Sequence, residues 1–96
     1  MGMDEIISSR REEIVALAAK HGAFNVRVFG SVAQGTADDK SDVDFLVEVK
    51  PGTSLMDLGG LLMDLQELLH RKVDIVTARA LHWYIRDRVL EEAKAV

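Results

Sequence analysis

The stretch that decides the fold runs from Phe29 to Leu46: Phe-Gly-Ser-Val-Ala-Gln-Gly-Thr-Ala-Asp-Asp-Lys-Ser-Asp-Val-Asp-Phe-Leu. The apolar run that leads into it, over 26–29, predicts a strand that ends at Gly30 and Ser31. A glycine at this point lets the backbone turn sharply and approach a ligand closely. The residues after it, 31–35, predict a short helical turn whose backbone N–H groups would point at a phosphate.

The second half of the stretch opens another predicted strand, Val43–Val49, with Asp42 and Asp44 at its start. Residues two apart on a strand point to the same face and lie about 6.6 Å apart. The two carboxylates should therefore lie side by side, across from the glycine turn. Carboxylate oxygens suit Mg²⁺ beside a phosphate, and two such ions can clamp the attacking and leaving oxygens of an in-line displacement.

A third acidic residue, Asp74, lies in the β-branched run over 72–77. A charge in the middle of such a run is out of place in a simple core strand. If this strand lies beside the second one, alternation puts Asp74 on the face that carries Asp42 and Asp44. A third carboxylate there could ligate the metal that activates the nucleophile or accept the nucleophile's proton.

This set of residues resembles a known family. Gly30-Ser31, ten intervening residues, Asp42-x-Asp44 and a lone strand aspartate at Asp74 are similar to the nucleotidyltransferase superfamily of the DNA polymerase β type. The small size resembles the minimal nucleotidyltransferases, the MntA-like antitoxins that are paired with HEPN-domain toxins. The resemblance covers nearly the whole chain.

The resemblance implies an enzyme that uses ATP and two Mg²⁺ ions. AMP would pass to a hydroxyl of a partner protein, a tyrosine of a HEPN ribonuclease toxin, with release of pyrophosphate. Gly30 and Ser31 would hold the β- and γ-phosphates, and Asp42 and Asp44 would ligate both ions. Asp74 would complete the catalytic metal site or take the hydroxyl proton.

Two other functions stay open. Many members of the family carry an arginine where this chain has Gln34. This difference favours an antitoxin with an idle site that neutralises its toxin by direct binding. The third alternative is a regulator that binds a nucleotide without turning it over.

The composition predicts a single domain over residues 1–96, with 48% hydrophobic and 29% charged residues. The net charge of −4 argues against strong nucleic-acid binding, which depends on Lys and Arg neutralising phosphates. The chain has no cysteine, so disulfides and thiolate metal sites are excluded. Neither a signal-peptide pattern nor an apolar run of about 20 residues is present, and we expect a cytoplasmic protein without membrane contact.

The predicted fold is α/β (α+β): a small mixed β-sheet of three or more strands flanked by helices, in the polymerase-β-like pattern. Its predicted elements are a helix over 4–20, a strand over 25–29, the helical turn over 31–35, a strand over 43–49, a helix over 55–69, a strand over 72–77 and a helix over 80–95.

Side chains outside the acidic trio have simpler interpretations. Leucines spaced three and four apart, beginning at Leu55, predict one buried stripe on the helix over 55–69. Within that helix, Gly59-Gly60 indicates either a late helix start or a closely packed backbone. His21 and His82 have no partners at metal-ligand spacing and are interpreted as structural. Trp83 and Tyr84 could pack in the core, stack on adenine or contact a protein.

Overall fold

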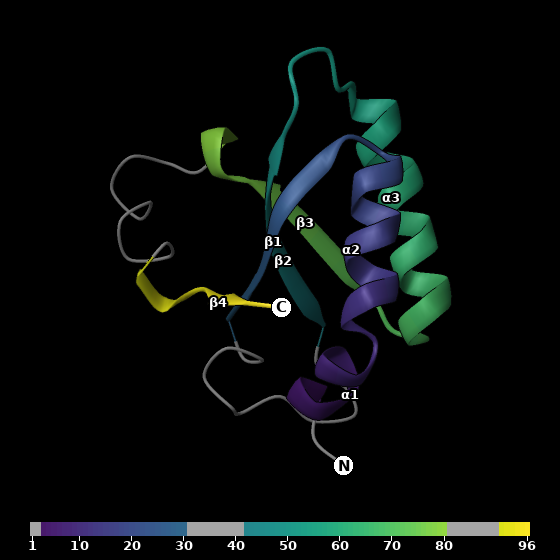
Figure 1. The fold of residues 1–96 in the computed structure, drawn as a ribbon, viewed down its shortest axis with the longest axis vertical. Coiled ribbons are helices and arrows are strands. Elements are labelled where there is room, and N and C mark those ends of the chain that lie inside the picture. Colours follow the sequence, from purple (N-terminus) through teal and green to yellow (C-terminus); the bar gives the residue numbers. More distant parts are fainter. Residues whose placement is uncertain (1–2, 31–41, 81–90) are drawn as a thin grey trace.

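The computed structural model describes residues 3–30, 42–80 and 91–96 (Figure 1). Its elements, in chain order, are α1 (Met3–Ser9), α2 (Arg11–Lys20), β1 (Ala23–Phe29), β2 (Val43–Val49), α3 (Leu55–Leu69), β3 (Val73–Thr77), the 3-10 helix η1 (Ala78–Ala80) and β4 (Lys94–Ala95).

The described strands form one four-stranded sheet in the order β3-β2-β1-β4. β1 is antiparallel to both β2 and β4, whereas β2 and β3 are parallel. A parallel pair needs a crossover connection, which α3 provides. The predicted mixed sheet flanked by helices is therefore confirmed.

The hydrophobic core lies between the sheet and the helices α2 and α3, which cover the same face of the sheet (Figure 1). The central strand β2 contributes three side chains with no exposed surface, those of Val43, Phe45 and Val47. Since these residues alternate along the strand, the residues between them point to the other face. The remaining buried members of the core are Ile7, Ile14, Ala18, Ala23, Val26, Val28, Leu61, Leu65, Leu69 and Val73.

Strand β1 contains a bulge that the sequence pattern did not predict. Its pairing with β2 shifts by one residue between Phe24 and Arg27, and Asn25 has a positive φ of 50°. The extra residue lets Ala23 and Val26, three positions apart, both point into the core. The strand consequently begins at Ala23, two residues earlier than expected.

The predicted helix over 4–20 is wrong in one respect, because it is divided at Arg10 into α1 and α2. Arg10 has φ −107° and ψ 14°, outside the helical region. Immediately before it, the Ser9 hydroxyl donates a hydrogen bond of 2.8 Å to the carbonyl of Ile6. Such local side-chain bonds compete with helical hydrogen bonding.

The predicted helix over 80–95 is wrong at its end. Lys94 and Ala95 form β4, which pairs with Val28 and Arg27 at the edge of the sheet. The backbone groups of β1 need partners on that side, and this tertiary pairing outweighs the helix propensity of the C-terminal residues. Residues 81–90, with His82, Trp83 and Tyr84, lie outside the described residues.

Helix α3 begins at a capping box, in which Ser54 Oγ accepts from the Asp57 backbone and the Ser54 N–H donates to Asp57 Oδ2. Its buried residues are Leu61, Leu65 and Leu69. Leu55, expected in the core, is 86% exposed, because the buried face is centred on Leu61 and Leu65 rather than on the first turn. Among the described residues, no helix is long and apolar enough to span a membrane.

Neither explanation predicted for Gly59-Gly60 is correct, because α3 begins at Leu55 and the close neighbour of Gly60 is a side chain rather than another backbone. A Cβ on Gly60 would lie 2.8 Å from Cε1 of the His21 ring, whereas a Cβ on Gly59 would meet nothing within 4 Å. The His21 ring is held there by Asp64, at 2.7 Å between Nε2 and Oδ2. Close packing of α2 on α3 thus requires Gly60, and the structural interpretation of His21 is confirmed.

Candidate active site

The predicted alternation of the acidic residues is what the sheet shows. Asp44 of β2 and Asp74 of β3 are direct partners in the parallel register, with Cα atoms about 4.8 Å apart. Their neighbours Val43 and Val73 are also partners and are buried in the core. Asp44 and Asp74 therefore lie together on the face of the sheet that points away from α2 and α3, which we call the acidic face.

Asp42 directly precedes β2 and is 44% exposed. Its Oδ2 lies 3.9 Å from Nζ of Lys72, which directly precedes β3. The N–H of Val43 donates a 3.0 Å hydrogen bond to the carbonyl of Lys72. This bond keeps the first residues of β2 and β3 in register. Lys72 is 70% exposed, so its weak ion pair leaves the ammonium free to turn toward a ligand.

The pKa of Asp44 responds to its burial and to the two other carboxylates. Its pKa is raised above the ordinary value, first by burial and then by the negative charges of Asp74 and Asp42. Like charges held this close disfavour the ionised form of the group that is least solvated. A cation placed among them would relieve that repulsion.

Gly30 closes the site on the side of β1. It follows Phe29, the antiparallel partner of Asp44, and has a positive φ of 68°. A Cβ on Gly30 would lie 2.7 Å from Oδ2 of Asp44, closer than side-chain carbons approach oxygen. Two features favour glycine at this turn: the positive φ of its backbone and the carboxylate that lies beside it.

The metal-binding role of Asp42, Asp44 and Asp74 stays a prediction. The oxygen donors fit Mg²⁺, which takes one or two protein carboxylates and keeps several waters. Within residues 3–30, 42–80 and 91–96, however, no three His, Cys, Asp or Glu side chains are already grouped closely enough to hold one ion. The carboxylates of the acidic face would therefore have to draw together around a cation. Ser31 and Gln34 lie outside the described residues.

Arg27 was not singled out by sequence reasoning. It is the antiparallel partner of Leu46, two residues along β2 from Asp44, and so lies on the acidic face. The signal that identified Asp74, a charge within an apolar strand, is equally present at Arg27.

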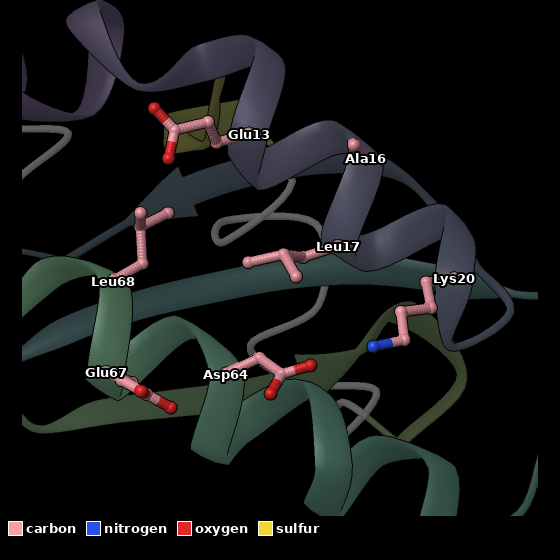
Figure 2. A pocket seen from close by; sticks show the side chains of 7 residues that line it. All are labelled: Glu13, Ala16, Leu17, Lys20, Asp64, Glu67 and Leu68. Atoms are coloured by element: carbon pink, nitrogen blue, oxygen red, sulfur yellow. The ribbon is translucent and has the colours of Figure 1, made fainter.

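The helical side of the molecule has a groove of about 570 Å³ between α2 and α3 (Figure 2). It lies on the opposite side of the sheet from the acidic face. Its lining side chains carry charges of both signs around an apolar floor. They are Glu13, Ala16, Leu17, Lys20, Asp64, Glu67 and Leu68.

Comparison with known sequences identifies the family. The sequence profile of the nucleotidyltransferase domain matches residues 11–96. The chain belongs to the nucleotidyltransferase family. The predicted membership is confirmed, and the chain is an enzyme of the nucleotidyl-transferring class.

Two curated relatives cover nearly the same length. A Methanocaldococcus jannaschii protein, provisionally named a protein adenylyltransferase, is 38% identical over 87 residues, which are 91% of this chain and 94% of that protein. The protein adenylyltransferase MntA of Thermococcus cleftensis is 33% identical over 90 residues, 94% of this chain and 88% of that protein.

Solved structures support the same assignment. A structure provisionally described as a minimal nucleotidyltransferase has 45% identity and a TM-score of 0.88, over 97% of this chain and 95% of that one. The polymerase-β-like fold of a minimal nucleotidyltransferase is thereby confirmed. A toxin–antitoxin complex with AMP-PNP shares the fold at 24% identity and a TM-score of 0.74, over 88% of this chain and 69% of that one.

The contact between Gly30 and Asp44 predicts that Gly30→Ala loses more stability than the left-handed backbone conformation alone accounts for. Gly52→Ala is the matched control, because Gly52 also has a positive φ but has nothing within 4 Å of its Cβ position. Both variants should lose about 1 kcal/mol for the left-handed conformation, and Gly30→Ala should lose more in chemical denaturation. The excess should disappear when Asp44→Ala is also present; an excess that persists would rule out this contact as its cause.

The raised pKa of Asp44 predicts how stability depends on pH. Between its ordinary value of 3.8 and the raised value, the folded chain binds more protons than the unfolded chain. The free energy of unfolding therefore falls as pH rises through that window. Asp44→Asn should raise the melting temperature at pH 7, and this gain should shrink as pH falls through the raised pKa. Glu48→Gln, a matched change on the same strand, is the control; a gain independent of pH would contradict the raised pKa of Asp44.

Proposed function

We propose that this nucleotidyltransferase transfers AMP from ATP to a hydroxyl group of a partner protein. The observation that carries the proposal is the pairing of Asp44 with Asp74 on the acidic face, beside the glycine turn at Gly30. In-line displacement at phosphorus needs a cation-binding set of carboxylates next to a place for the phosphates.

Asp42, Asp44 and Asp74 would hold two Mg²⁺ ions. Bound there, the ions supply charge neutralisation at the α-phosphate and polarise its oxygens. The Gly30 turn, together with Ser31, would receive the β- and γ-phosphates and orient the α-phosphorus for attack from the opposite side. Positioning of this kind supplies much of the rate acceleration in phosphoryl and nucleotidyl transfer.

The reaction forms a bond between the acceptor oxygen and the α-phosphorus and breaks the bond from that phosphorus to the bridging oxygen of pyrophosphate. The hydroxyl proton must leave as the bond forms. Asp74 is the more exposed of the paired carboxylates and lies at the edge strand of the sheet, where an acceptor can approach it. It would either accept this proton or complete the metal site.

The proposed acceptor is a toxin that is produced with this chain, a HEPN-family ribonuclease modified on a tyrosine. Both curated relatives carry the name protein adenylyltransferase, and one of them is an MntA protein. A reaction that consumes ATP and silences a ribonuclease would take place in the cytoplasm. If the site is idle, the same toxin would be neutralised by binding alone, without a change in its mass.

The test uses the purified chain, its co-encoded toxin, Mg²⁺ and ATP labelled at the α-phosphate. We expect label on the toxin and a mass increase of whole AMP units. Asp74→Asn and Asp44→Asn should each lower the transfer rate about 100-fold or more while keeping the circular dichroism of the folded chain. Glu48→Gln, a carboxylate farther along β2, should keep the rate.

Two results would contradict the proposal. The first is a toxin that is neutralised while its mass is unchanged, which would support capture by binding. The second is transfer that continues at the wild-type rate when both Asp44 and Asp74 are asparagine.

A further inference from the structure

Arg27 is a cation on the acidic face that the proposed chemistry leaves without a role. It lies in β1 between Val26 and Val28, which point into the core, so its own side chain points to the opposite face. Its cross-strand partner is Leu46, and its diagonal neighbour on β2 is Asp44. Diagonal side chains begin about 7 to 8 Å apart, which is within reach of a ligand that both residues touch.

The guanidinium of Arg27 has an unsatisfied group. Its Nε is buried and has no hydrogen-bond partner. None of the ion pairs found among the described residues includes Arg27, and the charges that shift the pKa of Asp44 are those of Asp74 and Asp42. A buried donor left unpaired costs about 1–3 kcal/mol, more if it is charged.

Packing accounts for only part of this side chain. Leu46, beside it on the acidic face, has no exposed surface, and the methylene groups of Arg27 are suited to covering it. A methionine would cover Leu46 equally well without burying an unpaired charged nitrogen. The guanidinium therefore needs an explanation beyond the fold.

The negative charge of the expected substrate explains why a guanidinium lies at this position. A nucleoside triphosphate brings several negative charges onto a face that already holds three carboxylates. A guanidinium offers a planar set of donors that matches the oxygens of a phosphate, and its hydrogen bonds to phosphate are charge-assisted. Arg27 lies on the β1 side of Asp44, the side on which Gly30 closes the site.

We propose that Arg27 binds the phosphate chain of the nucleotide, and that its guanidinium turns outward to do so, which brings the enclosed, unpaired Nε to a phosphate oxygen. This inference rests on the proposed function, because it assigns a further residue to the same substrate. Arg27 thereby sets the affinity for the triphosphate and contributes nothing to recognition of the base.

The test is calorimetric titration of the full chain with MgATP, inorganic tripolyphosphate and adenosine. Arg27→Met keeps the apolar part of the side chain and removes the donors. It should weaken MgATP and tripolyphosphate about 10- to 100-fold, the range for charge-assisted hydrogen bonds, and leave adenosine unchanged. The affinity of Arg27→Lys for MgATP should lie between those of the wild type and Arg27→Met. Lysine keeps the positive charge but loses the planar set of donors of the guanidinium.

Two controls separate this role from a structural one. Arg10→Met removes the same charge from the start of α2, where Arg10 pairs with Glu13, and should leave MgATP binding unchanged. The melting temperature of Arg27→Met without ligand should equal or exceed that of the wild type, since the unpaired nitrogen is gone. A purely structural arginine would lower it.

The outcomes are distinguishable. Wild-type chain that binds MgATP, with Arg27→Met binding it equally well, overturns the role of Arg27 alone. If Arg27→Met loses adenosine binding but keeps tripolyphosphate binding, Arg27 recognises the base, and its phosphate role is overturned. If Arg27→Met binds the nucleotide normally but binds the acceptor protein more weakly, the phosphate role of Arg27 is also overturned. Wild-type chain that binds neither MgATP nor tripolyphosphate overturns the proposed function as well.

Discussion

The constraint on which the site depends is the register between β2 and β3, which sets Asp44 directly beside Asp74. Two carboxylates on adjacent strands repel one another, and like charges placed opposite each other destabilise a sheet. Burial raises the pKa of Asp44, and the negative charges of Asp74 and Asp42 raise it further. A sheet that keeps such a pair is less stable at a position where a bound cation would offset the repulsion.

The rest of the fold holds this register in place. Val43 and Val73, the partners immediately before the two aspartates, are buried under α2 and α3, so a shift of one residue would turn the acidic side chains into the core. Both helices lie on one face of the sheet (Figure 1). The hydrophobic layer and the acidic face are thus two consequences of a single alternation along β2.

Much of this arrangement follows from the sequence. The alternation of β2 and β3 predicted that Asp44 and Asp74 would share a face. The glycine before Ser31 was expected to let the backbone approach a ligand, and the close neighbour that the structure shows is the side chain of Asp44. What could not be predicted depends on contacts between distant residues. Lys94 and Ala95 resemble the end of a helix until the edge of β1 is known to need a partner.

Other misses have local causes. The bulge at Asn25 and the division at Arg10 arise from single-residue conformations that hydrophobic periodicity does not report. Leu55 fits the apolar stripe by spacing, yet it lies beyond the part of α3 that meets the sheet. Arg27 carries the same signal as Asp74, a charge within an apolar strand, but its place beside Leu46 follows only from the register of β1 and β2. The roles of Asp42, Asp44 and Asp74 as ligands remain predictions.

The most direct test of the central claim is anomalous X-ray diffraction from crystals grown with Mn²⁺ and a non-hydrolysable ATP analogue. The account predicts anomalous density on the acidic face, with Mn²⁺ bound directly to carboxylate oxygens of Asp42 and Asp44 and with Asp74 turned toward the same position. Ordered nucleotide without Mn²⁺ at these residues, or Mn²⁺ only in the groove between α2 and α3, would contradict it.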